Sequence, residues 1–349
     1  MLWRGHLPPL RTPPISSRMQ GNSARFFDGG DAAAIVGLPV LSTVAWALPP
    51  AVWPSFIALA APFQRAGWGP HPLRRIATTL GDNVAATPAR ILNDLAANDI
   101  EAMLWLLRTG RSRGWKLRAH LRGAQHLDAA LAAGSGAVLW VGHFTFASLL
   151  SKVTLHAYGY DVHHLSHPRH GFSDSRFGIR FLNPIRQRLE RRFLASREEL
   201  NPENPAVALR NLRRRLADNQ AVSFTARSES AKPVAVPFLS GSLTLATGAA
   251  DLAYASGAPL FPVVTLRGDD GAFVTEIQPA LPLDRAAARS VATQAATAAF
   301  ARRLEPAVLS APGQWLGWLH PSLRPHSVGA RSPEAVGPRR SASRQAPAG

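Results

Sequence analysis

The segment from Gly134 to Leu150 places a histidine where it could act as an acid or a base. Its sequence, GSGAVLWVGHFTFASLL, contains a short apolar run, Ala137 to Val141, with the length and branching of a buried strand. Gly142-His143 then interrupts the pattern, and a largely apolar helical stretch follows to Tyr158. Open α/β sheets place their chemistry at the carboxyl ends of such strands. A histidine with its ordinary pKa of about 6.5 can accept a proton there at neutral pH, although a residue that merely caps the helix fits the same pattern.

The remainder of the chain alternates apolar runs with helical stretches. Strands are predicted at residues 161–165, 221–225, 234–239, 260–266 and 273–277, and helices at residues 88–110, 127–133, 204–219, 245–256 and 286–309. This alternation predicts an α/β fold, in which helices flank a mixed central sheet. The histidine segment supplies one of the buried strands.

A long uncharged segment precedes this pattern. No charged residue occurs from Ala32 to Gln64, and Pro49-Pro50 divides the stretch. A membrane span needs about 20 apolar residues, and arginines flank both ends here, which disfavours a single crossing. The pattern predicts a shallow hairpin or interfacial helices with Trp46, Trp53 and Trp68 near the lipid headgroups. A buried helical pair in a soluble protein is the alternative.

Four segments follow from these patterns. They are a disordered basic leader at 1–30, an apolar membrane-associated segment at 31–69, an α/β domain at 70–320 and a disordered basic tail at 321–349.

Composition limits the chemistry and the partners. The chain of 349 residues has no cysteine, which excludes disulfides, thiolate nucleophiles and cysteine-based metal sites. Its formal charge of +17 fits an anionic partner such as a phospholipid surface, an acidic carrier protein or a phosphorylated substrate. Nucleic acid is not expected as a partner, because no zinc finger, RNP-like motif or basic zipper accompanies the charge.

A series of short motifs extends the histidine segment in both directions. They are RG with HL at 122–127, VAVPF at 234–238, TG at 247–248, LA at 252–253, GAPLFPV at 257–263 and PGQWLGWLH at 312–320. In this order and at these separations, residues 32–320 resemble the late acyltransferases of lipid A biosynthesis. These are the lauroyl and myristoyl transferases within the lysophospholipid acyltransferase superfamily.

The resemblance implies a fold like that of the glycerolipid acyltransferases and a reaction. An acyl carrier protein or coenzyme A thioester would be the co-substrate, with no other cofactor and no metal, and a membrane lipid would be the acceptor. The site would lie at the cytoplasmic face of the bacterial inner membrane. In the family, a histidine general base is followed five positions later by an Asp or Glu that orients it.

This chain departs from that signature. His143 is present, but the fifth position is Ser148, and no acid occurs between Ala137 and Tyr160. Three interpretations remain open. An acid from elsewhere could replace the missing one, with candidates Asp161, Asp251 and Glu229. Ser148 could orient His143 by a hydrogen bond or through water. Alternatively, the protein binds lipid or an acyl carrier protein without catalysis.

Arginines near the predicted sheet edge are candidates for substrate binding. Arg227 follows the strand at 221–225 and could contact a phosphate or a thioester oxygen; a solvated loop arginine is the alternative. Residues 163–184 predict a loop over the carboxyl edge of the sheet, in which Arg169 and Arg176 would suit an anionic acceptor or the carrier's phosphopantetheine. Arg180, and Arg186 just beyond, share this character. Four histidines in this segment do not predict a metal site, since Pro168 prevents a regular helical face.

Overall fold

The computed structural model describes residues 26–111, 117–167, 170–200, 204–228 and 233–325. Most of the expected leader and tail lies outside these ranges. Their described ends differ from the expected disorder: helix α1 begins at Gly29, and residues Leu323–Pro325 form a strand, β10. The folded domain therefore extends to residue 325.

A seven-stranded sheet forms the centre of the molecule, in the order β1-β9-β8-β2-β5-β3-β4. Its strands are β1 (Ala119–Arg122), β2 (Ala137–Val141), β3 (Val162–Ser166), β4 (Ser196–Glu199), β5 (Ala221–Thr225), β8 (Leu260–Arg267) and β9 (Phe273–Ile277). Strands β8, β2, β5, β3 and β4 are parallel, whereas β9 runs antiparallel to β8 and parallel to β1. The predicted mixed sheet is confirmed.

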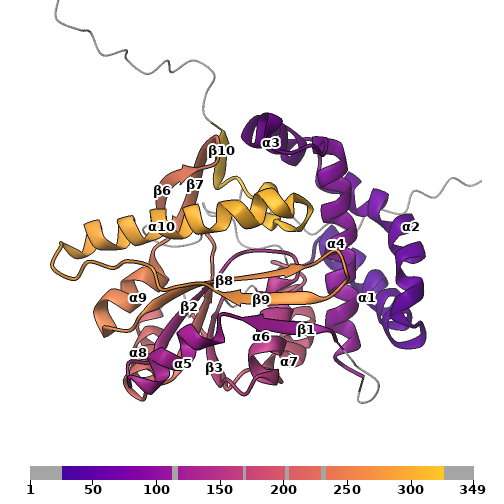
Figure 1. The fold of residues 1–349 in the computed structure, drawn as a ribbon. Coiled ribbons are helices and arrows are strands. Elements are labelled where there is room, and N and C mark those ends of the chain that lie inside the picture. Colours follow the sequence, from indigo (N-terminus) through magenta and orange to yellow (C-terminus); the bar gives the residue numbers. More distant parts are fainter. Residues whose placement is uncertain (1–25, 112–116, 168–169, 201–203, 229–232, 326–349) are drawn as a thin grey trace, which may run out of the picture.

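Helices flank this sheet (Figure 1), as predicted. Those that follow the strands are α5 (Ala124–Ala132), α6 (Ala147–Ala157), α7 (Asn183–Arg191), α8 (Pro205–Ala217), α9 (Gly248–Ser256) and α10 (Arg289–Ser310). A π-helical turn, η3 (Gly178–Leu182), precedes α7, and two short 3-10 turns, η4 (Pro312–Gln314) and η5 (Leu316–Leu319), follow α10. Helix α6 contacts β1, β8 and β9, while α8 and α9 contact each other and the strands around β2 and β5. Every residue of β2 is buried, as a central parallel strand covered on both faces requires.

A second, three-stranded sheet has the order β10-β7-β6, with β6 at Pro233–Phe238 and β7 at Gly241–Ala246. The prediction of a helix from residue 245 is wrong at its start, because Leu243 and Leu245 belong to β7 and α9 begins only at Gly248. The burial of β7 alternates along the strand, so the two leucines face the core while their neighbours are more exposed.

Four helices precede the sheet and lie together at one side of it (Figure 1): α1 (Gly29–Ala47), α2 (Trp53–Ala66), α3 (His71–Leu80) and α4 (Pro88–Arg108). Two 3-10 turns, η1 (Pro50–Val52) and η2 (Gly81–Asn83), connect them. Helices α1, α2 and α3 all pack against α4. Thr87 caps α4 by accepting a hydrogen bond from the backbone N–H of Arg90, and Pro88 occupies the first helical position, where its missing N–H costs nothing.

The uncharged N-terminal segment forms two helices separated at Pro49-Pro50, and α1 is long and apolar enough to cross a membrane. Only 22% of the apolar stretch of α1 is buried inside the protein. The predicted interfacial position is wrong for Trp53, which is 2% exposed and packs edge-on against Trp105 at 4.9 Å between ring centroids. Packing of α2 on α4 turns this ring inward. Trp46 remains 48% exposed.

Candidate active site

His143 lies directly beyond the carboxyl end of β2, as predicted. Its backbone carbonyl accepts a hydrogen bond from the N–H of Leu316 at 3.1 Å, and the next residue, Phe144, forms a β-bridge with Trp315. The glycine before it has little space, because a Cβ on Gly142 would lie 2.9 Å from the Phe144 ring and 3.0 Å from Leu304. The closing PGQWLGWLH segment thus fixes the backbone that presents the histidine.

The imidazole opens into a cavity of about 190 Å³. Its polar and charged lining includes Asp99, His143, Ser148, His170, Asp174, Arg186, Arg227 and His320. The ring centroids of His143 and His320 are 5.3 Å apart. These residues come from α4, the β2–α6 connection, the first turn of α6, the segment after β3, α7, the segment after β5 and the residue after η5. Folding therefore gathers polar groups from across the chain at the carboxyl edge of the sheet.

Apolar side chains also line the cavity. They include Ala102, Met103 and Leu106 on α4, Leu149 and Leu150 on α6, and also Trp68, Phe146, Phe172, Leu316 and Leu319. A second, smaller cavity of about 20 Å³ is also lined by His143, Arg227 and His320. His143 therefore lies in a cavity that both polar and apolar side chains line.

The surroundings of His143 keep its imidazole neutral. Burial is the largest cause of a pKa well below the ordinary value, and electrostatic interactions with Arg227, His320, His170 and Arg186 lower the pKa further. A neutral imidazole can accept a proton at pH 7. Among the described groups with the largest electrostatic effect on His143, none stabilises the imidazolium that results.

Ser148 occupies the position that the resemblance assigns to a carboxylate, in the first turn of α6. Its Oγ accepts a hydrogen bond from Nη2 of Arg186 at 2.9 Å. The interpretation in which Ser148 orients His143 directly therefore has no hydrogen bond to support it in the described residues, where the serine is engaged with a guanidinium instead.

Of the three acids considered as replacements, the two that the structure describes are not brought to His143. Asp161 precedes β3 at the amino-terminal edge of the sheet, opposite the edge where β2 ends. Asp251 on α9 accepts hydrogen bonds from Thr247 at 2.6 Å and from Arg289 at 2.8 Å, and lines neither cavity. Glu229 lies outside the described residues.

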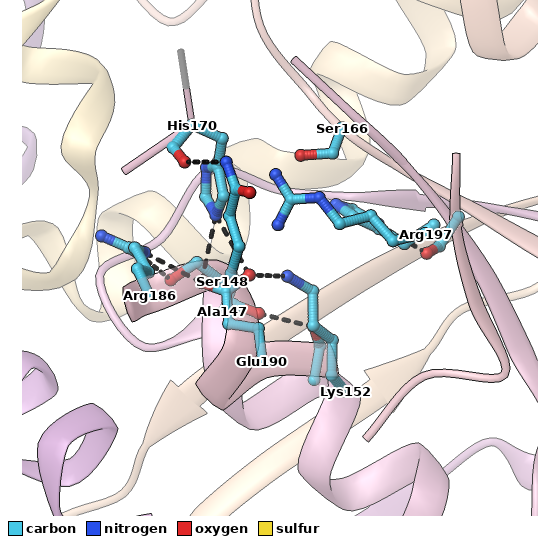
Figure 2. Close-up of polar contacts among 12 residues, drawn as sticks. Ala147, Ser148, Lys152, Ser166, His170, Arg186, Glu190 and Arg197 are labelled. Carbon is cyan, nitrogen blue, oxygen red and sulfur yellow. Dashed lines mark hydrogen bonds and ion pairs between the residues drawn. The ribbon is translucent and has the colours of Figure 1, made fainter. Parts of the chain in front are cut away.

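An acid that the sequence analysis did not single out, Glu190 on α7, organises the polar side of the site. Figure 2 shows Lys152, His170 and Arg186 converging on its carboxylate. Lys152 Nζ is 2.5 Å from Oε2, Arg186 Nε is 2.8 Å from Oε1 and His170 Nε2 is 3.0 Å from Oε1. Glu190 is fully buried. Burial acts to raise the pKa of its carboxyl, but the three neighbours together hold it well below the ordinary value.

The pKa values of two partners of Glu190 are also shifted. Burial lowers the pKa of Lys152 even though Glu190 opposes the change. Burial likewise lowers the pKa of His170 to about 4, against the opposing effect of Glu190, so this histidine is neutral at pH 7. The sequence contains one indication of this cluster: Glu190 is the only acid between Asp174 and Glu198, in a segment rich in arginine. The sequence does not indicate which residues pair with Glu190.

The predicted substrate-binding arginines differ in their positions relative to the cavities. Arg227 follows β5 and lines both cavities. Arg176 is exposed and lines neither of them, and Arg169 lies outside the described residues. Arg186, which the sequence placed in the same basic group, reaches the cavity from α7.

The histidines of the 163–184 segment have separate partners. His163 Nδ1 is 2.7 Å from Ser196 Oγ, and His164 Nδ1 is 2.8 Å from Ser223 Oγ. Within the described ranges, no group of three or more histidine or acidic side chains is arranged to hold a metal ion.

The buried histidines predict acid sensitivity. An unfolded chain protonates His170 as the pH falls past 6.5, whereas the folded protein resists protonation until about 4. The free energy of unfolding should therefore keep its full value above pH 6.5 and fall by about 3 kcal/mol between pH 6.5 and 4. The lowered pKa values of His143 and His164 act in the same direction. Urea unfolding across this range measures the loss, and His170→Gln should give a shallower dependence. Parallel curves for the two proteins would contradict this origin.

Comparison with known proteins identifies the family. A search of curated proteins found no match. The family model described as bacterial lipid A biosynthesis acyltransferase matches residues 64–325, which include every described residue that lines the cavity. With three quarters of its length matched and the histidine of the resemblance at the edge of the sheet, this chain belongs to the bacterial lipid A biosynthesis acyltransferase family.

Proposed function

We propose that this protein is a membrane-associated acyltransferase that moves a fatty acyl chain from an acyl carrier protein or coenzyme A thioester to a hydroxyl of a lipid or lipid precursor. The observation that carries the proposal is the position of His143, a neutral imidazole in a cavity lined by both polar and apolar side chains. A hydroxyl acceptor suits the polar side, and a fatty acyl chain suits the wall formed by α4 and α6.

In the proposed reaction, an imidazole nitrogen of His143 takes the proton of the acceptor hydroxyl as its oxygen bonds to the thioester carbonyl carbon. The carbonyl oxygen becomes negative, and Arg227, which lines both cavities beside His143, is placed to stabilise it. The carbon–sulfur bond then breaks, and the leaving sulfur receives the proton from the imidazolium. The ester and a free thiol are the products.

The N-terminal helices support the membrane association. Ile35, Val36 and Val40 on α1 and Leu59 and Phe63 on α2 are each 43–71% exposed, although all are large and apolar. Exposed apolar residues concentrated on two adjacent helices favour contact with lipid. Because acyl carrier protein and coenzyme A thioesters are made in the cytoplasm, we place the site at the cytoplasmic face of the inner membrane.

A transfer assay tests the proposal. The purified protein is mixed with radiolabelled acyl thioesters of both donor types and a total lipid extract of the host, and the labelled product is identified by mass spectrometry. Label in a lipid ester supports the proposal and reveals the acceptor. If the protein binds acyl chains but transfers none, the alternative of a non-catalytic binder of lipid or acyl carrier protein is correct. The guanidinium beside Ser148, where the family has a carboxylate, is the observation that favours this alternative.

The apolar wall predicts control of acyl chain length. Ala102→Phe fills part of the cavity from α4 and should shift the preferred donor to a shorter chain. Each methylene excluded from the cavity forfeits about 0.8 kcal/mol, or roughly fourfold in relative kcat/KM. Competition between donors of different length measures the shift. An unchanged preference would show that the acyl chain binds elsewhere.

A further inference from the structure

The charge beside His143 is reversed relative to the sign that the family signature implies. Where a carboxylate is expected five positions after the histidine, Ser148 is hydrogen-bonded to the guanidinium of Arg186. The groups with the largest electrostatic effect on His143 are Arg227, His320, His170 and Arg186, and all act in the same direction. Two acids, Asp99 and Asp174, also line the cavity, but neither is among these groups. Burial raises the pKa of Asp99, which favours its neutral form.

Arg186 is held firmly in this position. Its Nε donates to the buried Glu190 at 2.8 Å, and its Nη2 donates to Ser148 at 2.9 Å. A guanidinium has five N–H donors, so these two bonds leave further donors available on a side chain that lines the cavity. The side chain is 18% exposed. A guanidinium fixed in this way is suited to bind an oxyanion through more than one oxygen.

The buried region behind Arg186 carries more positive than negative charge. Besides Arg186, the carboxylate of Glu190 faces Lys152, which is 5% exposed. The side chain of Arg197 on β4 is 3% exposed and feels the charge of Glu190, and its Nε lies 3.6 Å from Oε1 of the half-exposed Glu199. The Nε and Nη2 of Arg197 make no hydrogen bond in the described part of the chain. An anion in the cavity would compensate this excess, because opposite charges interact strongly where water is excluded.

We propose that the cavity binds a phosphate monoester of the acceptor against Arg186, and that this phosphate supplies beside His143 the negative charge that the family's carboxylate would supply. The inference rests on the proposed function and defines its acceptor, a molecule whose reactive hydroxyl lies within a few ångströms of its own phosphate. Arg186 is then a substrate-binding residue, and Glu190 positions it. Helix α6, which begins at Ala147, adds the positive end of its dipole to the same cavity.

The proposal has a consequence for pH dependence. His143 must be neutral to act as a base, so activity falls as the pH drops through its pKa. A bound phosphate favours the charged imidazole and raises that pKa, against the opposing electrostatic effects of Arg227, His320, His170 and Arg186. Because kcat/KM reports the free enzyme and kcat reports the complex, the acid limb of kcat should lie at higher pH than that of kcat/KM.

Phosphate binding can be measured without any acyl transfer. NMR titration of His143 in the full-length protein, with and without inorganic phosphate, should show its pKa rising when phosphate is present. Arg186→Gln should weaken phosphate binding about tenfold or more, since hydrogen bonds to charged groups are among the strong ones. The matched control is Arg188→Gln, an exposed arginine of the same helix that lines neither cavity. Phosphate that leaves the titration of His143 unchanged, or binds equally well to both variants, is an adventitious ion only and overturns the proposal.

A second pair of variants avoids disturbing Glu190. Ser148→Asp places a carboxylate at the proposed phosphate position and should raise the pKa of His143 without phosphate while reducing phosphate affinity. Ser148→Asn has nearly the same size without the charge and should do neither. If Ser148→Asp binds phosphate as tightly as the wild type does, the anion does not bind at this position.

Transfer assays then distinguish the source of the phosphate. Removing the phosphate from the acceptor should lower kcat with the wild type at least tenfold, and Ser148→Asp should recover part of the loss with this acceptor. An acyl N-acetylcysteamine thioester lacks the donor's phosphodiester and should still depend on the acceptor phosphate. Equal kcat with both acceptors, or dependence on the donor's phosphodiester alone, overturns the inference but leaves the proposed acyl transfer intact. A phosphate-dependent His143 titration without any transfer would support the anion site and refute the acyltransferase.

Discussion

Replacing His143 by alanine is expected to lower the rate of acyl transfer by about 10²- to 10⁴-fold, the range that general base catalysis contributes. The fold should survive, because the main contacts at this position are made by the backbone: the carbonyl of His143 bonds to Leu316, and neighbouring Thr145 donates its N–H to the Gln314 carbonyl at 2.8 Å. The transfer assay measures the rate, and urea unfolding verifies the fold. Acyl-chain binding should be retained.

His120→Ala is the control for the loss of a histidine, since His120 is exposed on β1 and lines neither cavity. It should transfer at the wild-type rate. Full activity in the His143 variant would show that another group takes the proton. Equal loss in both variants would point to a change in the sample rather than in the site.

Replacing Glu190 by glutamine should cost about 3–5 kcal/mol of folding free energy, the usual cost of removing one partner of a buried ion pair. The change keeps the size of the side chain but leaves Lys152 and Arg186 without the buried charge that compensates them. Adding Lys152→Met to this variant should recover part of the loss, because one of the uncompensated charges is then removed. Urea unfolding at pH 7.5 measures all three proteins.

The comparison for this prediction is Asp94→Asn, which removes the exposed Arg90–Asp94 pair at 3.3 Å on α4. An exposed pair at this helical spacing contributes only about 0.3–0.5 kcal/mol. A loss below about 1 kcal/mol for Glu190→Gln would mean that the cluster contributes little to folding. Loss of transfer in this variant under conditions where it remains folded would support its role in positioning Arg186.

The part of the site formed by β2 could be predicted from the sequence. A central parallel strand is buried on both faces, so it appears as an unbroken apolar run, and Gly142-His143 marks its end by composition alone. The interruption of the N-terminal helices at Pro49-Pro50 was visible for a similar reason, since proline disrupts a helix through its own geometry. Both features depend on residues that are neighbours in the chain.

Strands without such a local signal were missed. β1 and β4 are the two end strands of the large sheet, and β4, with the sequence SREE, has no fully buried residue. The β6–β7 hairpin turns at Leu239, a residue with φ of 49°, where glycine or asparagine would have indicated a turn. The N–H of Leu239 donates to Glu305 on α10 at 2.8 Å, so a contact distant in sequence helps to hold this uncommon conformation.

The sequence by itself determined the class of fold, the position of His143 at the edge of the sheet and the family resemblance. These features depend on apolar runs and short motifs, whose residues are neighbours in the chain. Only the tertiary structure decided what surrounds the histidine. Arg186 and Glu190, four residues apart on a helix, look in sequence like an ordinary surface ion pair. Packing buries Glu190 against Lys152 on α6 and His170 after β3, and it directs Arg186 to Ser148. The interactions among these charges are strong because water is excluded around them. That exclusion depends on elements that only the fold brings together.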